Sequence, residues 1–406
     1  MSTKMENLRR VVLSATVAAL AVLGPASARA DLASDKPAAL LIYPKVIVDT
    51  EGVLTGAPNT DTFIQVTNVS GAIVGVRCFL VNATWTCSNN PLQACTPETE
   101  VERCGPGAAC QPPPVCDATD FEMTLTKRQP VRWSLGQGTL GSSPGDQPDN
   151  LRVIPAASTD PFIGEVKCVE VDPTTFKPIN EFPYQPPKNP TGDLVGTATI
   201  VSGKVETSGP PQLDAREYSA LGFQPAGPNN GDDALVLGGA NAEYAGCPNV
   251  VILDHLFDDA SVTSGNGITG TVRSDLTVVP CTQDLSEVTE PASTVLQFLV
   301  FNEFEQRFST STRLGCFKEV PLSNIDTRPT RSDDYASVFN VNVQGTLSGQ
   351  SRLRAVSSAT SAKGVVALLE EFWECELNNP HCTTAANTHF SGSRSLSDTI
   401  TMHPLQ

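Results

Sequence analysis

The sequence predicts an all-β protein built from two antiparallel β-sandwich domains. Short apolar runs recur along the chain, either alternating with polar residues or fully apolar, and turn-forming residues close each of them. Val, Ile, Thr and Phe dominate the runs, as half-buried pleated surfaces require. The 30 glycines and 32 prolines indicate frequent turns. Many short strands with few helices are typical of immunoglobulin-like β-sandwiches.

Residues 1–30 predict a secretory signal peptide. Lys4, Arg9 and Arg10 form a charged start, residues 11–23 form an apolar run, and residues 28–30 (Ala-Arg-Ala) suit cleavage after residue 30. The apolar run is shorter than the roughly 20 residues that span a bilayer, which favours cleavage over a membrane anchor. A twin-arginine signal is less compatible with many cysteines, which oxidise after export. We expect an exported protein in the periplasm, on the cell surface or outside the cell.

The predicted mature chain is acidic, which excludes several classes of partner. Without the signal, 23 Lys and Arg remain against 43 Asp and Glu, a net charge of −20. This charge repels nucleic acid and anionic membrane surfaces. No later stretch reaches 18 apolar residues, so we expect no membrane insertion of the mature chain. Its 376 residues are enough for two domains or more.

Twelve cysteines follow the signal, and their even number predicts disulfides. Zinc sites usually place ligand pairs two to four residues apart, whereas neighbouring cysteines here are separated by at least five residues. The absence of C-x-x-C argues against a thioredoxin-like redox site. We expect disulfides between cysteines that bracket adjacent predicted strands, Cys281–Cys316 and Cys375–Cys382. A third expected bond, Cys78–Cys168, joins cysteines farther apart in the sequence.

Eleven segments are predicted strands. They are residues 39–48, 62–68, 74–81, 121–126, 164–171, 194–201, 250–253, 276–279, 295–301, 307–316 and 338–344. One further segment has helix-like spacing of its apolar residues, from Val365 to Trp373. Because a short apolar run fits either a helix or a buried strand, both interpretations stay open there.

These segments group into two predicted sandwich domains, at residues 31–205 and 245–406. A Gly-, Pro- and Asn-rich stretch at 206–244 is the predicted connector. Half of the cysteines lie within residues 78–116, so we expect a cysteine-rich insertion at about 87–117 in the first domain. Its proline and glycine content disfavours regular strand pairing, and disulfides would have to order it.

The two predicted domains share a pattern that suggests an internal duplication. Thr62 and Thr294 each open a Thr-x-x-Gln motif, and a Cys-Phe pair follows each of them, at Cys78 and Cys316. Later segments keep the same order, those opened by Phe121 and Phe339 and those opened by Gly164 and Gly364. The alternative is that two β-sandwiches share such patterning for physical reasons alone.

Several stretches resemble uncharacterised exported, cysteine-containing β-sandwich proteins of Gram-negative bacteria. They are LLIYPKVIVD at 40–49, DTFIQVTNVSG at 61–71, VRCFLVNATWTCSNN at 76–90, DPFIGEVKCVEVD at 160–172, GCPNVVILDH at 246–255 and FLVFNEFEQRFSTSTRLGCF at 298–317. The resemblance spans most of the mature chain. It implies export and a β-sandwich, and it carries over no functional residue, because no activity is known for such proteins.

Two sequence motifs of enzymes occur in the chain without the local structure that each needs to function. We therefore predict no catalytic or cofactor-binding residues. Residues 141–145 spell the hydrolase motif G-x-S-x-G, but Pro144 follows the serine and has no N–H for an oxyanion hole. G-x-G-x-x-G occurs at 136–141 and at 265–270. A dinucleotide site needs a helix after the third glycine, whereas a turn and a predicted strand follow here.

Two places offer metal ligands, and we predict no metal site at either. His255 lies beside Asp254, Asp258 and Asp259, which we interpret as a strand end followed by a solvated acidic turn. Residues 229–233 (Asn-Asn-Gly-Asp-Asp) offer oxygen ligands of the kind calcium prefers, without the spacing of an EF-hand. The remaining histidines, which show no metal-binding helical spacing, are His381, His389 and His403.

The sequence therefore predicts a non-enzymatic protein without a cofactor. We expect an exported structural, adhesive or interaction protein whose partner is an unknown protein or surface. A calcium- or carbohydrate-binding module is the alternative. A secreted hydrolase with two carboxylates is a third interpretation, although the chain has only three tryptophans to form the aromatic platforms usual in such clefts.

Overall fold

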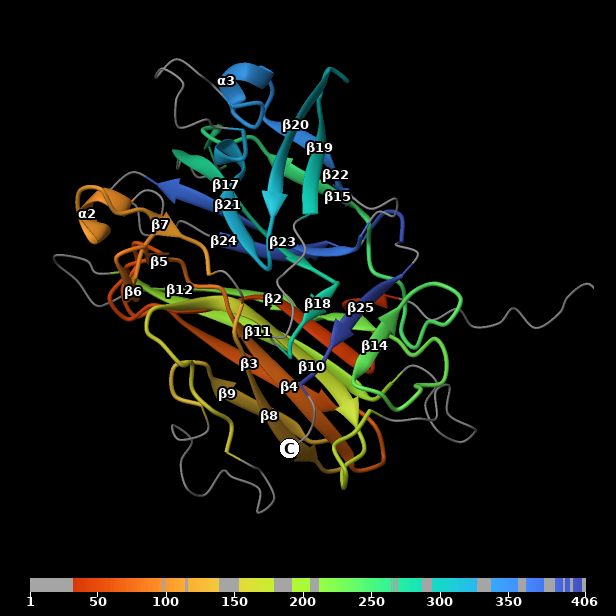
Figure 1. Ribbon diagram of the computed structural model, residues 1–406. Coiled ribbons are helices and arrows are strands. Elements are labelled where there is room, and N and C mark those ends of the chain that lie inside the picture. The colour runs from red at the N-terminus through yellow and green to blue at the C-terminus, as the bar shows by residue number, and fades with distance from the viewer. Residues whose placement is uncertain are drawn as a thin grey trace, which may run out of the picture. The chain divides into compact units, whose positions relative to one another are not determined.

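Short, mostly antiparallel strands account for nearly all regular structure in the described residues (Figure 1). The computed structural model describes residues 32–96, 99–113, 116–138, 153–178, 192–204, 212–263, 265, 267, 269–286, 294–326, 337–356, 363–375, 384–389, 391–394 and 397–403. Residues 31–406 form one compact unit. The predicted all-β class is confirmed, while the tandem immunoglobulin-like arrangement stays a prediction.

Sheets 1 and 2 form the first β-sandwich. The strand order in sheet 1 is β1 (Leu32–Ala33), β13 (Leu221–Phe223), β2 (Leu40–Val48), β10 (Phe162–Val171), β4 (Val74–Asn82) and β8 (Ala118–Leu125). The order in sheet 2 is β12 (Gln212–Ser219), β11 (Leu194–Lys204), β3 (Asp61–Asn68) and β9 (Pro130–Ser134).

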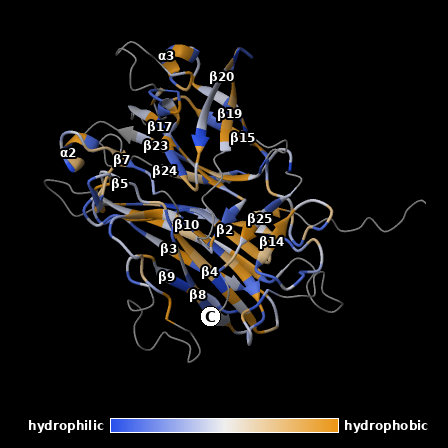
Figure 2. Ribbon diagram, in the orientation of Figure 1, coloured by the Kyte–Doolittle hydropathy of each residue, from blue (hydrophilic) through white to orange (hydrophobic). Residues whose placement is uncertain are grey.

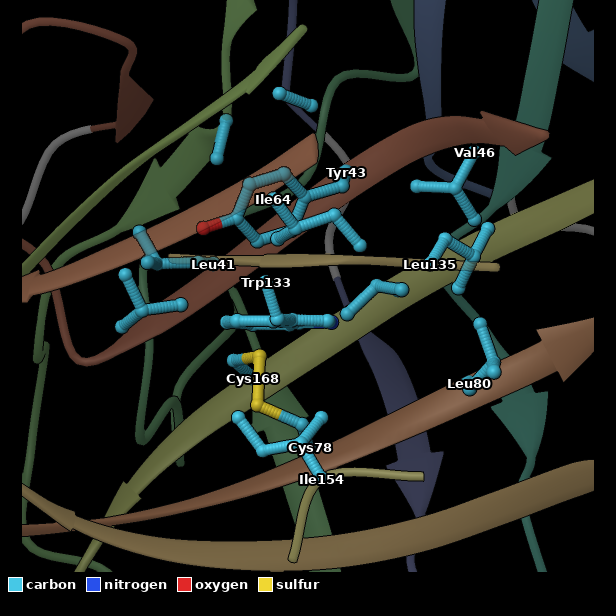
Figure 3. Close-up of a cluster of buried hydrophobic side chains, with 14 of the residues drawn as sticks. Leu41, Tyr43, Val46, Ile64, Cys78, Leu80, Trp133, Leu135, Ile154 and Cys168 are labelled. Atoms are coloured by element: carbon cyan, nitrogen blue, oxygen red, sulfur yellow. A yellow bond between two sulfur atoms is a disulfide. The ribbon is translucent and has the colours of Figure 1, made fainter. Parts of the chain in front are cut away.

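The first core fills the space between these two sheets. β3 alternates between partly exposed and buried residues along its whole length, so Ile64 faces the core as a period-two pattern requires. Figure 3 shows Ile64 beside Tyr43 and Trp133, with the disulfide of Cys78 and Cys168 in the same cluster. The predicted bond between these two cysteines is confirmed, and it joins the paired strands β4 and β10.

Sheets 3 and 4 form the second β-sandwich. The order in sheet 3 is β15 (Val250–Leu256), β22 (Ser348–Val356), β19 (Thr294–Asn302) and β20 (Arg307–Leu314). The order in sheet 4 is β16 (Ser261–Thr263), β17 (Thr269–Pro280), β23 (Val365–Cys375) and β24 (Thr384–His389), and β21 (Lys318–Pro321) also pairs with β17.

Two small sheets accompany the sandwiches. Sheet 5 has the order β14 (Ala234–Leu237), β25 (Asp398–Thr401) and β18 (Gln283–Asp284). Sheet 6 has the order β6 (Asn90–Ala94), β5 (Thr86–Cys87) and β7 (Cys110–Gln111). The described helices are α2 (Glu100–Cys104), α3 (Val341–Gln344) and a 3-10 turn (Leu322–Asn324).

The segment with two open interpretations is a strand. In β23, Val365, Ala367 and Leu369 pack into the core of the second sandwich. Leu368, on the opposite side of the strand, belongs to the core of the first. A strand buried on both faces needs a continuous apolar run, which is why its sequence does not show simple alternation.

The predicted strand at 338–344 is wrong, because α3 forms there. The Asn340 side chain accepts a hydrogen bond from the N–H of Asn342, as a helix N-cap does. Gly345 ends the turn with a positive φ of 67°, a left-handed conformation that glycine adopts without strain. The apolar residues of this segment thus form one helical turn. The other ten predicted strands overlap strands of the structure.

The predicted bond Cys281–Cys316 is wrong. Cys281 pairs with Cys247, and Cys316 pairs with Cys116, 200 residues away in the sequence. Closeness of two strands along the chain does not determine which strand ends meet in space. Cys382 of the predicted pair Cys375–Cys382 lies outside the described residues.

The start of β23 explains why Cys281 meets Cys247. The N–H of Cys281 donates to the carbonyl of Gly364 at 3.0 Å, and the N–H of Val365 donates to the carbonyl of Pro248 at 2.6 Å. Gly364, just before β23, and Val365, its first residue, therefore hold the segments that carry the two cysteines. This contact depends on long-range pairing, which a spacing argument does not contain.

The predicted connector and insertion hold more regular structure than expected. Within 206–244, β12 and β13 complete the sheets of the first sandwich, and β14 belongs to sheet 5. The insertion contains sheet 6 and α2, although its composition disfavours strands. Two disulfides, Cys87–Cys104 and Cys95–Cys110, hold it together.

Strand pairing adds no support to an internal duplication. β3 and β4, which carry the first copy of the shared motif, lie in different sheets. β19, which contains the second Thr-x-x-Gln, forms a hairpin with β20 within one sheet. The duplication stays a hypothesis based on the sequence alone.

Candidate functional site

The described parts of the motif matches are ordinary turns. Residues 141–145 lie outside the described residues. Gly136 and Gly138 lie in the turn after β9, and a Cβ on Gly138 would come within 2.3 Å of the Ile154 carbonyl oxygen. Gly265 and Gly267 lie between β16 and β17. Strand follows strand there, as expected from the sequence.

His255 is a buried structural histidine. Its Nδ1 lies 3.1 Å from the Leu256 carbonyl and its Nε2 lies 2.7 Å from Ser351 Oγ, so a neutral ring satisfies both contacts. Burial lowers the pKa of His255 to about 4. Asp258 is also buried, and it accepts hydrogen bonds from the N–H groups of Ser274 and Ser323. The expected solvated turn is therefore wrong for Asp258, which holds backbone segments together.

Several side-chain oxygen atoms of the loop at 229–233 accept hydrogen bonds from the loop's own backbone. The Asn229 side chain accepts from the N–H of Gly231, and the Asn230 side chain accepts from the N–H of Asp232. The Glu243 carboxylate accepts from the N–H groups of Asn230 and Val236. These contacts describe a turn stabilised by its own side chains.

Three cysteine sulfurs lie close enough together to hold a metal ion. The Sγ atoms of Cys87, Cys95 and Cys104 are within 4.8 Å of one another, the one such group among the described residues. All three sulfurs are in disulfides. Because metals bind the thiolate, the oxidised insertion has no free ligand at this point.

A buried cluster of charges joins strands of the two sandwiches. Lys45 of β2 pairs with Glu370 of β23 and with Glu319 of β21, and Arg216 of β12 also pairs with Glu370. Burial lowers the pKa of Lys45, but the two carboxylates outweigh burial and raise it above its ordinary value. Each carboxylate has a cationic partner, so the cluster fits a structural role.

A hollow of about 410 Å³ lies beside β8, and its lining contains two carboxylates. They belong to Asp120 and Glu122, with Phe121, Val153 and other residues around them. The Arg77 guanidinium donates to Asp120 at 2.7 Å, so this carboxylate already has a cationic partner. The hollow offers no matched pair of free carboxylates of the kind that a glycosidase uses.

The outer face of sheet 3 carries a group of exposed arginines, which we name the arginine face. They are Arg307 and Arg313 on β20 and Arg352 and Arg354 on β22. The alternate residues of both strands point to the second core, so all four arginines lie on the same open side. Figure 2 shows hydrophilic colour along β20, in contrast with the hydrophobic strands of the cores.

Strand pairing sets the spacing of the arginine face. In one row, Leu299 of β19 lies between Ser309 of β20 and Arg352 of β22. Neighbouring strands are about 4.8 Å apart, which places the arginines of β20 and β22 about 10 Å apart across the sheet. Arg307 and Arg313 are six residues apart on one strand, or about 20 Å.

These arginines have no ion pairs within the described part of the chain. The chain as a whole has a net charge of −17, so a cluster of unpaired cations on one face is unusual for it. A guanidinium binds carboxylates, phosphates and sulfates through paired N–H donors. The partly exposed Leu299 and Phe301 add apolar surface among them. The face can therefore bind an anionic group that also has an apolar part.

One edge of sheet 3 is free in the structure as described. β20 is the last strand of the sheet and pairs with β19 alone. At the opposite edge, segment 391–393 accepts hydrogen bonds from the N–H groups of Ile252 and Val250, and so covers β15. Natural proteins usually shorten, cover, bulge or charge a strand edge, because its unpaired backbone groups bind other chains, and β20 carries the charges of Arg307 and Arg313.

The sequence contains a local signal for this surface. Residues 307–313 read Arg-Phe-Ser-Thr-Ser-Thr-Arg, which places both arginines and two serines on one face of the predicted strand. The contribution of Arg352 and Arg354 depends on β22 lying next to β19. That pairing joins residues about 50 positions apart in the sequence, and no local pattern shows it.

Neither α2 nor α3 has the length and apolarity that a membrane-spanning helix needs, and the described residues contain no other candidate. Among known proteins, the chain matches no family model and no curated protein sequence. The site therefore has to be interpreted from its own geometry.

Proposed function

We propose that this chain is an exported, non-enzymatic interaction protein that binds an anionic partner on the arginine face. The observation that carries the proposal is the set of four exposed, unpaired arginines on one side of sheet 3 in a chain of net charge −17. Export and a disulfide framework, both expected from the sequence, support a protein that works outside the cytoplasm.

Charge contrast gives this surface a specific use. The acidic remainder of the protein repels anionic molecules, so an anionic partner that binds must approach the arginine face. Electrostatic steering of this kind raises association rates and suppresses wrong orientations. The rigid sheet presents its charges at fixed spacing, so binding orders few side chains other than the arginines themselves.

The test is binding of the mature protein, residues 31–406, to immobilised dextran sulfate at several salt concentrations. We expect measurable binding that weakens as salt rises, because arginines that bind sulfates release counterions and are screened. The double variant Arg352→Gln with Arg354→Gln should bind about tenfold more weakly, roughly 1.4 kcal/mol.

Arg132→Gln removes one positive charge and is the control for the single variants Arg352→Gln and Arg354→Gln, each of which also removes one. Arg132 is an exposed arginine on β9 in the first sandwich, with its guanidinium 5.1 Å from the Phe63 ring centroid. Its loss changes the net charge without touching the arginine face, and binding should stay within twofold. Absence of binding by the wild-type protein, or an equal effect of the control and the arginine-face substitutions, would refute the proposal.

A further inference from the structure

We infer that the anionic partner is an extended, acidic polypeptide segment that adds to β20 as a fifth strand of sheet 3. The inference rests on the proposed function and names the chemical class of its partner. Two independent features of β20 support it, the free backbone edge and the pair of arginines on the same strand.

The free backbone groups belong to the residues that carry the arginines. The N–H of Asn302 donates to the carbonyl of Gln306 at 3.3 Å, which makes these two the first hydrogen-bonded pair of the β19–β20 hairpin. Hydrogen-bonded and non-hydrogen-bonded pairs alternate in an antiparallel ladder. Arg307, Ser309, Ser311 and Arg313 therefore direct their N–H and C=O groups away from β19.

The same four residues point their side chains to the open face. An added antiparallel strand would place two of its residues opposite Arg307 and Arg313, six positions apart and on that face. Acidic side chains at these positions would meet the two guanidinium groups. Ser309 and Ser311 between them are small and leave room for the peptide's intervening side chains. Main-chain bonds supply affinity in this mode of binding, and the two charges supply specificity.

A second copy of this chain is a poor occupant of the edge. Antiparallel pairing of two β20 strands about Thr310 would place Arg307 of each copy opposite Arg313 of the other. Like charges directly opposite one another destabilise a strand pair. The arginines thus disfavour self-association through this edge and favour an acidic strand. The edge would select its partner by repulsion of a second copy as well as by attraction of acidic side chains.

A long anionic polysaccharide would use the arginines without the edge. It has no strand backbone to pair with β20, so its binding would depend on charge alone. The free N–H groups of Ser309 and Ser311 would then contribute nothing. This difference separates the two classes of partner in an experiment.

The probe is a blocked nine-residue peptide with Glu at its second and eighth positions and alternating Thr and Val elsewhere. The control peptide has the same sequence but is N-methylated at its fourth and sixth amides, which would face Ser311 and Ser309. We expect the first peptide to bind the mature protein in a calorimetric or fluorescence titration. N-methylation should weaken binding at least tenfold, because it removes main-chain donors and keeps both charges.

Protein variants test the same contact from the other side. Arg307→Gln with Arg313→Gln should weaken peptide binding about tenfold. Ser311→Pro removes one edge N–H and should also weaken it, whereas Ser311→Ala keeps that N–H and should not. A proline is tolerated at an edge position whose N–H faces solvent. Unchanged dextran sulfate binding by Ser311→Pro would show that this variant keeps its fold. If the variant does not fold, the N-methylated peptide still tests the main-chain contact with the wild-type protein.

The outcomes separate this inference from the proposed function. If dextran sulfate binds through Arg352 and Arg354 but the peptide does not bind, the inference is overturned and the proposed function stands. Equal binding of the methylated and unmethylated peptides also overturns the strand-addition mode. If neither dextran sulfate nor peptide binds, both proposals fail.

Discussion

Lys45 of β2 and Glu370 of β23 form an ion pair in which both side chains are buried. Arg216 of β12 contacts the second carboxylate oxygen of Glu370, so this carboxylate lies between two cations. Burial alone raises the pKa of Glu370, but the attraction of Lys45 and Arg216 outweighs it and holds the pKa below its ordinary value. The cluster therefore links the first and second sandwiches through buried charges, each of which is compensated by an opposite charge.

Substitution of Glu370 should destabilise the fold strongly. Glu370→Gln leaves Lys45 and Arg216 buried with one fewer anion, and removal of one partner from a buried pair typically costs about 3–5 kcal/mol. We expect the free energy of unfolding in urea to fall by roughly 3 kcal/mol. Because the folded-state pKa of Glu370 is lowered, its stabilisation is present above the unfolded pKa and is lost as the pH falls through the folded value.

Glu217→Gln is the control for that substitution. Glu217 is exposed on β12, next to Arg216 in the sequence, and exposed substitutions usually change stability by less than about 0.5 kcal/mol. Equal unfolding free energies for the two variants would show that the buried cluster contributes no net stability.

Asp275 should give the protein a pH dependence of the opposite sign. Burial raises its pKa to about 7, despite the attraction of Arg273, whose Nε lies 3.1 Å from its carboxylate. The folded state then binds more protons than the unfolded state between about pH 4 and 7, so this carboxyl stabilises most at low pH and loses that contribution as the pH rises through 7.

The measurement for Asp275 is urea unfolding of wild type and Asp275→Asn across that pH range. The stability of the variant relative to wild type should increase with pH, by an amount on the order of 3 kcal/mol. A constant difference between the two proteins would show that Asp275 titrates normally in the folded state.

Patterns within one strand predicted the β-sheet architecture well. The alternation in β3 and the apolar run in β2 each depend on which faces of a single strand are buried. The bond between Cys78 and Cys168 was also predicted, although the spacing argument favoured the other two pairs over it. The strand predicted at 338–344 was wrong, because the cap of Asn340 and the left-handed conformation of Gly345 outweighed the strand propensity of the valines.

Features that depend on distant pairing could not be predicted. Cys116 meets Cys316 because segments 200 residues apart pack together. The arginine face was missed for the same reason: Arg352 joins the arginines of β20 only through β19. Lys45 looks like an isolated charge in an apolar run, and Glu370 like one of two adjacent acidic residues; only the packed structure shows that Lys45 and Glu370 compensate each other.

His255 should destabilise the protein on acidification. Its neutral ring satisfies Ser351 and the Leu256 carbonyl, and its folded pKa of about 4 lies below the unfolded value near 6.5. The associated stability is present above about pH 6.5 and is lost as the pH falls toward 4. The free energy of unfolding of His255→Gln should fall less between pH 6.5 and 4 than that of the wild-type protein. In NMR spectra, the ring resonances of wild-type His255 should not titrate above pH 5. Titration near pH 6.5 would contradict the buried neutral ring.

Calcium should not stabilise the loop at 229–233. The Asn229 and Asn230 side chains already accept hydrogen bonds from the N–H groups of Gly231 and Asp232. We expect the same thermal unfolding midpoint with excess calcium and with a chelator. A higher midpoint in calcium would mean that the folded state binds the ion selectively, and a calcium-binding module would become the better interpretation. Asp232→Asn would then remove the difference.

Loss of the bond between Cys116 and Cys316 should destabilise more than loss of a local one. This bond closes a loop of 200 residues, whereas Cys87–Cys104 closes one of 17. The chain-entropy model makes the longer crosslink about 2 kcal/mol more stabilising, because it restricts the unfolded chain more. We expect this order of unfolding free energies for the double serine variants Cys116→Ser with Cys316→Ser and Cys87→Ser with Cys104→Ser. Peptide mapping without reductant should recover Cys316 linked to Cys116. Recovery of Cys316 linked to Cys281 would instead show that the two sandwiches lack this covalent connection, and the entropic difference between the variants should then disappear.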